Sequence, residues 1–229
     1  MTLKAIIFDV DGTLADTEDG HRESFNKAFA ESGLDWNWDV ALYDKLLKVT
    51  GGKERIKYFV ETCQPDFTKP ADYDGFVKDL HAVKTRHYNT MLREGHILLR
   101  PGITQLIGAA RQRGIRLAIA TTTSPENVAT LLQQGFGADS ERIFEVIGCG
   151  DIVPHKKPAP DIYFWVLEKM GLPAADCIAL EDSENGLRSS LAAGIKTFIT
   201  PNHYTRNQDF AGAAAVLSDL NDLPERLFR

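Results

Sequence analysis

The sequence contains only three cysteines, Cys63, Cys149 and Cys177, and they stand at scattered positions. An odd number at such spacing excludes a disulfide framework, and no two of them form a CxxC pair that would hold a metal. We therefore assign the cysteines no role. Their pattern favours a reducing cytoplasm as the protein's location.

The sequence also lacks an excess of basic residues and any long apolar run. The 26 Lys and Arg residues against 32 Asp and Glu residues give a formal net charge of −6. This balance argues against a general nucleic-acid-binding protein, because such proteins carry a basic face. No apolar run approaches the roughly 20 residues that cross a bilayer. Residues 1–4 lead directly into a short apolar run, so we expect no signal or transit peptide.

These absences predict that the protein has no nucleic-acid partner and no membrane partner. Anionic small molecules are still possible substrates, because local Lys and Arg side chains or a metal ion can outweigh the negative net charge of the chain. With 229 residues and 43% hydrophobic side chains, the chain is long enough for one full core and a small second unit.

What the sequence does contain is a series of short apolar runs typical of buried parallel strands. Ala5–Phe8 are four consecutive apolar residues, which favours a strand buried on both faces. From about residue 100, similar runs alternate with helical stretches, so the fold class predicted is α/β, with a Rossmann-like parallel sheet. The later predicted strands are Leu117–Ala120, Ile143–Ile147, Cys177–Leu180 and Lys196–Ile199.

Helix boundaries are marked in the same part of the chain. Ser124 followed by Pro125 is typical of a helix start, with Ser as the cap and Pro at the first position. Gly135, Gly171 and Gly194 stand where helices should end, because glycine readily adopts the left-handed cap conformation.

A different pattern, without convincing strands, covers the stretch between the first strand and the rest of the sheet. Apolar residues recur there at helical spacing, as in Phe25, Ala28 and Phe29. We therefore expect an inserted, all-helical domain. The predicted domains are residues 1–16 with 97–229 for the α/β core and residues 17–96 for the helical insertion.

The two ends of the insertion, residues 14–17 and 97–101, are expected to form a two-stranded hinge. Within the insertion, Trp36 and Trp38 bracket a connection between helices. We expect these indoles to pack between helices rather than to line a sugar.

Two carboxylates directly follow the first predicted strand, in Asp9-Val10-Asp11-Gly12-Thr13. In open α/β sheets, ligands bind at the carboxyl ends of the strands. Carboxylates crowded together there repel one another unless a cation lies between them or one of them keeps a proton. The pattern predicts a metal-assisted carboxylate site, and the alternative is an ordinary Asp-Gly turn.

Four separated motifs, Asp9–Leu14, Thr121, Lys157-Pro158 and Glu181–Gly186, stand in order along the predicted core. Their order and strand-end placement resemble the haloacid dehalogenase-like (HAD) hydrolase superfamily over nearly the whole chain. The helical insertion resembles the C1-type cap of that family. Thr50–Arg55, with the cap as a whole, is most similar to the CbbY branch of sugar-phosphate phosphatases, a neighbour of β-phosphoglucomutase.

The resemblance implies a catalytic role for three residues. Asp9 is the implied nucleophile, since a carboxylate can attack phosphorus and form an aspartyl-phosphate. Asp11 is the implied general acid and base, and because the dehalogenase branch has no acid at this position, phosphoryl transfer is favoured. Lys157 is implied to stabilise charge on the transferring phosphoryl group, although a solvated lysine before a proline is the alternative.

The same resemblance implies a Mg²⁺ ion, which prefers hard oxygen ligands. The implied ligands are the side chains of Asp9 and Asp182 and the backbone carbonyl of Asp11, with Glu181 nearby. A helix cap is the alternative explanation for the Glu-Asp-Ser sequence of the fourth motif.

A phosphate site is implied at Thr121 and at the backbone N–H of Thr122, at the start of a helix. Three consecutive threonines are also ordinary strand-end residues, so both explanations stay open. His21 matches a cap histidine that is implied to couple closure to Asp11, against the alternative of a structural histidine. Further residues implied to bind substrate, against the alternative of solvated surface, are Asp16, Glu18, His21, Gly51, Gly52, Lys53, Arg55, Lys84 and Arg206.

The function implied is that of a Mg²⁺-dependent phosphatase acting on a small phosphorylated sugar, as a cytoplasmic monomer. The CbbY resemblance implies a sugar bisphosphate, with xylulose 1,5-bisphosphate as the characteristic substrate of that branch. Alternatives are a mutase of the β-phosphoglucomutase type, a phosphonatase, and a binding protein without catalytic activity.

Overall fold

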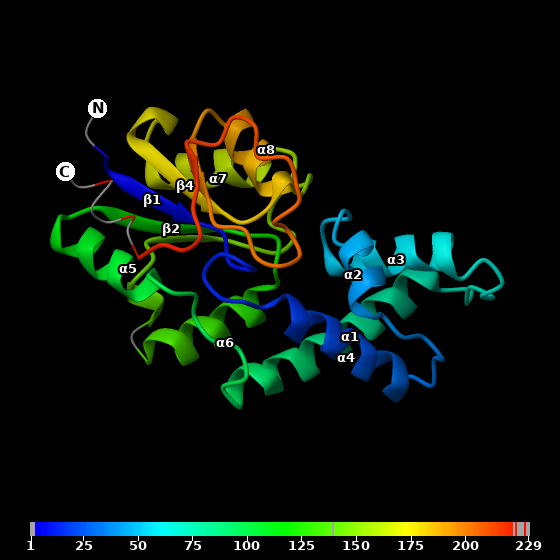
Figure 1. Ribbon diagram of the computed structural model, residues 1–229. Helices are drawn as coiled ribbons and strands as arrows, with labels where there is room; N and C mark the ends of the chain where they lie inside the picture. Colours follow the sequence, from blue (N-terminus) through cyan, green and yellow to red (C-terminus); the bar gives the residue numbers. More distant parts are fainter. Residues whose placement is uncertain (1–2, 139, 222, 224–226, 228–229) are drawn as a thin grey trace. The chain divides into compact units, whose positions relative to one another are not determined.

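The computed structural model describes residues 3–138, 140–221, 223 and 227, and the chain forms two compact units (Figure 1). Met1–Thr17 and Ile97–Arg229 make up the first unit, and Glu18–His96 make up the second. Thr17, which the sequence analysis placed in the helical insertion, belongs to the first unit.

The first unit is built on a six-stranded sheet in the order β3-β2-β1-β4-β5-β6, with every pair of neighbours parallel. Its central strand β1, Ala5–Phe8, lies between β2 (Arg116–Ala120) and β4 (Cys177–Glu181). Along the chain, β2 and β3 are added on one side of β1, and β4, β5 and β6 are then added on the other side. The strand order therefore reverses next to β1. The prediction of an α/β fold with a parallel sheet is confirmed.

The outer strands differ most from the sequence-based expectation. β5 covers Lys196–Ile199 as predicted, whereas β3 covers Val146–Gly148 instead of Ile143–Ile147. Ile143 closes a turn, since its N–H donates to the carbonyl of Ser140 at 3.1 Å. β6, Ala215–Val216, was not predicted, because two residues are too few to show a period.

Helices cover both faces of this sheet (Figure 1). α5 (Ile103–Gln112) and α6 (Pro125–Phe136) lie on one face. α7 (Asp161–Met170) and α8 (Glu184–Ala192) lie on the other. Short 3₁₀ helices cover Ser140–Arg142 and Ala174–Asp176.

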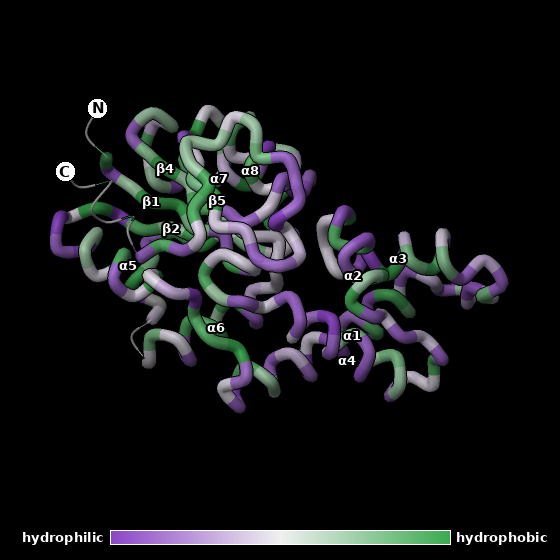
Figure 2. Tube along the Cα trace, in the orientation of Figure 1, coloured by the Kyte–Doolittle hydropathy of each residue, from purple (hydrophilic) through white to green (hydrophobic). Residues whose placement is uncertain are grey.

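The central strand is buried from both sides, which explains its unbroken run of apolar residues. Ile7 belongs to a buried cluster with Tyr163 and Val166 of α7. Phe8 packs edge-on against Phe144, with ring centroids 5.8 Å apart. Figure 2 shows the central strands as a hydrophobic layer between more polar surfaces.

The predicted helix boundaries are mostly confirmed. Ser124 caps α6, and Gly171 and Gly194 have φ values of 62° and 77° just after α7 and α8. Gly135 is an exception, because it lies inside α6, where a Cβ would come within 2.9 Å of Leu99 Cδ2. The helix ends at Gly137 instead.

The segments on either side of the helical insertion pair with each other, as the hinge prediction requires. Ala15 and Leu99 form an antiparallel bridge. The N–H of Asp16 donates to the carbonyl of Leu98 at 3.3 Å, and the N–H of Arg100 donates to the carbonyl of Leu14 at 2.9 Å.

The second unit is all-helical over its described residues, as predicted. An aromatic core holds it together, with the Trp38 ring centroid 4.4 Å from that of Phe25 and 5.0 Å from that of Phe29. Trp36 packs against Phe59 in the same core, so both indoles pack between helices. The helices are α1 (Glu18–Glu31), α2 (Val40–Leu46), α3 (Gly52–Cys63) and α4 (Tyr73–Arg93).

Across the described part of the chain, every helix is too short or too polar to cross a membrane.

Candidate active site

Three acidic side chains meet where β1 and β4 end, beside the reversal of strand order. Asp9 follows β1 directly, Glu181 is the last residue of β4, and Asp182 comes next. Parallel strands end at the same edge of a sheet, and the crevice at such a reversal is where open α/β sheets bind ligands. All three side chains are buried.

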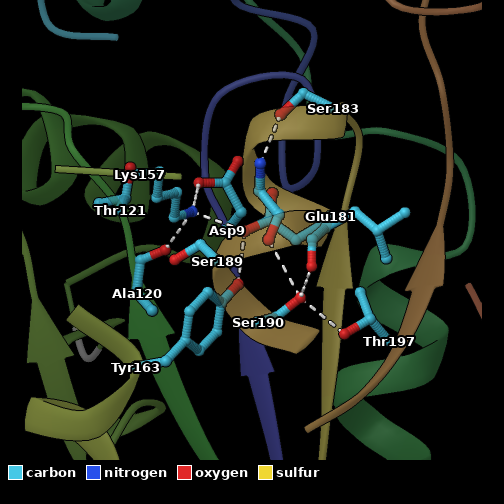
Figure 3. Close-up of polar contacts among 12 residues, drawn as sticks. Asp9, Ala120, Thr121, Lys157, Tyr163, Glu181, Ser183, Ser189, Ser190 and Thr197 are labelled. Atoms are coloured by element: carbon cyan, nitrogen blue, oxygen red, sulfur yellow. Dashed lines mark hydrogen bonds and ion pairs between the residues drawn. The ribbon is translucent and has the colours of Figure 1, made fainter. Parts of the chain in front are cut away.

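Lys157 joins these acidic groups to one another. Its Nζ donates to Asp9 Oδ1 at 2.7 Å, to Glu181 Oε1 at 2.6 Å and to the carbonyl of Ala120, the last residue of β2, at 2.8 Å (Figure 3). The ammonium group therefore has three oxygen partners, from the ends of three strands. The structure thus brings together residues from the first, third and fourth sequence motifs.

The site holds more acidic than basic side chains. Burial raises the pKa of Asp9 to about 8, with Lys157 opposing the rise and the carboxylates of Glu181 and Asp11 adding to it. Burial alone would lower the pKa of Lys157, but Asp9 and Glu181 reverse this and raise it above its ordinary value. Lys157 thus provides one positive charge for several crowded carboxylates. A second cation would favour the ionised form of all these carboxylates.

The acidic cluster fits a hard divalent cation. One oxygen from each of Asp9, Glu181 and Asp182 lies within 4.8 Å of the other two. Glu181 Oε2 is buried and has no hydrogen-bond partner among the described residues. An unpartnered buried carboxylate oxygen is costly, and oxygen ligands of this kind suit Mg²⁺ or Ca²⁺. The acidic cluster predicted from the sequence is therefore present.

Asp11 lies in the same loop as Asp9 but outside the cluster of three. Its backbone forms a bridge with Ala15, and the residue is partly exposed. Its carboxylate is near enough to Asp9 to contribute to the raised pKa of that residue. A partly exposed carboxyl group beside a buried one is suited to exchanging protons with a ligand or with water.

Two glycines in the sequence motifs make room for these carboxylates. A Cβ on Gly12 would lie 2.2 Å from Asp182 Oδ2, and a Cβ on Gly186 would lie 1.9 Å from Glu181 Oε2. Real Cβ atoms do not approach oxygen this closely. Glycine at both positions is therefore a condition for the observed placement of the acidic side chains.

Tyr163, which belongs to none of the sequence motifs, supports Glu181 from α7. Its hydroxyl donates to Glu181 Oε1, the same oxygen that accepts from Lys157 (Figure 3). Burial raises the pKa of Tyr163 well above its ordinary value, so the hydroxyl keeps the proton that it donates. The sequence offered a weak signal only, a tyrosine on the first turn of the helix that follows the Lys157 motif.

Two further supporting residues were missed, Asn202 and Arg100. Asn202 Nδ2 donates to Asp182 Oδ2 at 2.8 Å. Arg100 donates to the backbone carbonyls of Gly12, Thr200 and Pro201. Nothing in the sequence near either residue pointed to these contacts, which join segments far apart in the chain.

Thr121 and Thr122 lie in the loop between β2 and α6, before the start of the helix, as the predicted Ser124 cap implies. Thr121 is buried, and its Oγ1 accepts from the N–H of Thr123 at 3.2 Å. Thr122 is partly exposed. The helix begins only at Pro125, after its Ser124 cap. Both threonines still follow Ala120, whose carbonyl accepts from Lys157, so they lie beside the acidic site.

Asp16 and Arg206 are both exposed residues of the first unit. Asp16 belongs to the segment that pairs with residues 98–100, and Arg206 follows the Asn202 turn. Neither belongs to the acidic cluster of Asp9, Glu181 and Asp182.

In the second unit, His21 and Lys84 form a buried pair. Lys84 Nζ lies 2.6 Å from His21 Nδ1, and the His21 ring stacks on Tyr88 with centroids 4.0 Å apart. An ammonium group can only donate, so Nδ1 accepts and a neutral His21 carries its proton on Nε2. The pair links α1 to α4.

Glu18 and Arg55 belong to one network within the second unit. Tyr43 OH donates to Glu18 Oε2 at 3.0 Å, and Arg55 Nη1 donates to Tyr43 OH at 3.1 Å. Arg55 also donates to the carbonyls of Leu46 and Val49, each at 3.2 Å. The guanidinium group therefore holds the connection between α2 and α3.

The Gly51-Gly52-Lys53 segment forms the start of α3. Gly51 caps the helix with a φ of 97°, which favours glycine. A Cβ on Gly52 would lie 2.4 Å from His81 Nε2, so this position needs a small residue. Lys53 is half-buried in the first turn.

Comparison with known proteins gives a consistent family match. The sequence model described as "Hydrolase: haloacid dehalogenase-like hydrolase" matches residues 3–194. The chain is 49% identical to the plasmid-encoded protein CbbY of Cupriavidus necator, over 97% of this chain and 88% of that protein.

Solved structures of a CbbY protein are similar as well. The crystal structure of CbbY from Rhodobacter sphaeroides in complex with phosphate matches with a TM-score of 0.91 and 46% identity, covering 97% of this chain and 96% of that one. An Asp-to-Asn mutant of the same protein, in complex with xylulose-(1,5)bisphosphate, matches with the same TM-score, identity and coverage.

Proposed function

Because the chain belongs to the haloacid dehalogenase-like hydrolase family, we propose that it is a Mg²⁺-dependent phosphatase that hydrolyses a small phosphorylated sugar. The observation that carries this proposal is the group formed by Asp9, Lys157, Glu181 and Asp182. It combines a nucleophilic carboxylate, a fixed positive charge and an acidic cluster that suits a divalent cation. A phosphoryl-transfer site needs all three.

In the first step of this proposal, an oxygen of Asp9 attacks the phosphorus atom. The bond between phosphorus and the sugar oxygen breaks, and Asp11 gives its proton to that leaving oxygen. The product is an aspartyl-phosphate on Asp9. Lys157 stays protonated and stabilises the negative charge on the phosphoryl oxygens and on Asp9 as the bonds change.

In the second step, Asp11 takes a proton from a water molecule, whose oxygen attacks the phosphorus atom. The bond to Asp9 breaks, which restores its carboxylate and releases inorganic phosphate. Thr121 and the N–H of Thr122 bind phosphate oxygens in both steps. The partial exposure of Asp11, next to the buried Asp9, supports this division of roles.

The side chains of Asp9 and Asp182 and the backbone carbonyl of Asp11 would hold Mg²⁺, with Glu181 beside them. When bound, Mg²⁺ offsets the repulsion between the Asp9 carboxylate and the phosphoryl oxygens. The raised pKa of Asp9 supports this assignment, because a cation bound beside the buried carboxylate would favour its ionised form.

We propose that the helical second unit acts as a C1-type cap and selects the sugar. Its candidate residues are Glu18, His21, Gly51, Gly52, Lys53, Arg55 and Lys84, and Asp16 and Arg206 are candidates in the first unit. The similarity to a CbbY protein crystallised with xylulose-(1,5)bisphosphate supports a sugar bisphosphate as substrate. We further propose that the protein acts as a monomer in the cytoplasm.

The test is a panel of sugar monophosphates and bisphosphates, including xylulose 1,5-bisphosphate, with purified full-length protein and Mg²⁺. We expect phosphate release, the highest kcat/KM for a sugar bisphosphate, and loss of turnover with EDTA. Absence of phosphate release from every phosphorylated sugar would overturn the proposal. Formation of an isomeric sugar phosphate without phosphate release would support a mutase instead.

A further inference from the structure

The loop after β5 carries a buried asparagine that belongs to none of the four sequence motifs. Asn202 Oδ1 accepts from the N–H groups of Tyr204 at 2.8 Å and Thr205 at 3.1 Å. Its own N–H donates to Thr205 Oγ1 at 2.9 Å. These bonds form a tight turn around the Asn202 side chain, whose orientation is thereby fixed.

The same side chain reaches the acidic cluster with its other end. Asn202 Nδ2 donates to Asp182 Oδ2 at 2.8 Å. The amide also lies over Gly12, where a Cβ would come within 2.6 Å of Nδ2. With Oδ2 held in this way, the Asp182 carboxylate cannot rotate freely, and its other oxygen has a defined position.

Arg100 supports this loop from the hinge segment. One nitrogen, Nη1, donates to the backbone carbonyls of both Gly12 and Thr200, and Nη2 donates to the carbonyl of Pro201 at 3.0 Å. The guanidinium group therefore ties the loop after β1 to the residues just before Asn202. Arginine suits this position because its rigid, planar group carries five donors.

We propose that Asn202 is a positioning residue that orients Asp182 for cation binding, and that Arg100 holds the loop that carries Asn202. Residues that hydrogen-bond to metal ligands commonly set ligand orientation, and their loss typically lowers metal affinity about 10–100-fold. The inference rests on the proposed function, because it assumes that the acidic cluster binds a cation.

The test measures Mn²⁺ binding to the full-length protein by electron paramagnetic resonance, without substrate. Mn²⁺ takes the same oxygen ligands as Mg²⁺, and the free ion gives the signal. In Asn202→Ser, the hydroxyl can still accept the turn hydrogen bonds but is too short to reach Asp182. Asn207→Ser makes the same substitution at an exposed position five residues later and is the matched control.

We expect Asn202→Ser to weaken Mn²⁺ binding about 10–100-fold, and Asn207→Ser to bind as the wild type does. Wild-type affinity in folded Asn202→Ser would overturn the inference, even if the variant were less thermostable. If Asn202→Ser does not fold, Arg100→Lys replaces it, since lysine keeps the charge but cannot hold all three carbonyls. We expect a smaller loss there, and unchanged affinity would overturn the inference.

The wild-type titration separates this inference from the proposed function. If the wild-type protein binds no Mn²⁺, the proposed cation site is wrong, and this inference is overturned with it. If the wild type binds Mn²⁺ and Asn202→Ser binds it equally well, the cation site stands and only the role of Asn202 is wrong.

Discussion

The two units of this protein use their buried charged residues in different ways. In the first unit, Lys157 contacts two buried carboxylates and a strand-end carbonyl, so its charge lies among oxygen atoms. In the second unit, the buried Lys84 lies against the His21 ring and over the faces of Phe25 and Tyr88. The contacts described for these two buried lysines thus differ, with oxygen atoms around Lys157 and with aromatic rings around Lys84.

We propose that Lys157 stabilises charge that changes during the reaction, and that Lys84 joins α1 to α4 and orients His21. We therefore assign the reacting groups to the first unit. The proposed contribution of the second unit is to choose the substrate, and the variants below test this division.

The largest effect is expected from Asp9→Asn. The amide has the shape of the carboxylate but cannot attack phosphorus, so kcat should fall by at least about 10⁴-fold while the fold stays intact. Phosphate release and circular dichroism measure the two properties. Asp209→Asn, the same change at an exposed position of the first unit, is the control. Near-wild-type turnover in Asp9→Asn would show that Asp9 is not the nucleophile.

The second prediction compares the two buried lysines directly. Lys157→Met leaves Asp9 and Glu181 without their ammonium group, so we expect kcat to fall about 10²–10³-fold. Breaking a buried ion pair should also lower the free energy of unfolding by about 3–5 kcal/mol without added cation. Urea denaturation and steady-state kinetics measure these effects.

Lys84→Met is the matched variant in the second unit. We expect mainly a higher KM, and a loss of about 0.5–2 kcal/mol in the free energy of unfolding, because contacts with aromatic faces are weaker. If Lys84→Met lowered kcat as much as Lys157→Met, the division between chemistry and selection would be wrong.

A smaller effect is expected from Gly186→Ala. The added Cβ would overlap Glu181 Oε2, so the carboxylate must move, at a cost of about 1–3 kcal/mol in stability. Activity should fall with it. Gly108→Ala in α5 is the control, since its Cβ would meet nothing within 4 Å and alanine favours a helix by about 1 kcal/mol. Equal thermal stability of the two variants would show that Glu181 is not confined as described.

Much of the fold could be predicted from the sequence, because the patterns involved are local. Buried parallel strands appear as unbroken apolar runs, so β1, β2, β4 and β5 were located correctly. The two-residue β6 has no such run. The late start of β3 depends on a turn at Ile143, which periodicity does not indicate. The family resemblance was confirmed by the match over residues 3–194.

The candidate site was predicted in part for a similar reason. Asp9, Lys157, Glu181 and Asp182 stand in recognisable motifs, and the structure brings them together. Tyr163, Asn202 and Arg100 support them through contacts between distant segments, and such contacts leave no local pattern. The roles of the second-unit residues remain predictions. The contacts described for these residues are with one another, and the sequence around them shows only charge and spacing.

The most direct test of the proposed mechanism is a rapid chemical quench of the wild-type protein during turnover of a sugar phosphate, with peptide mapping by mass spectrometry. The proposed mechanism predicts a phosphoryl group on Asp9 when Mg²⁺ is present and none when EDTA replaces it. Turnover in which phosphate never appears on Asp9, or appears on another residue, would contradict it.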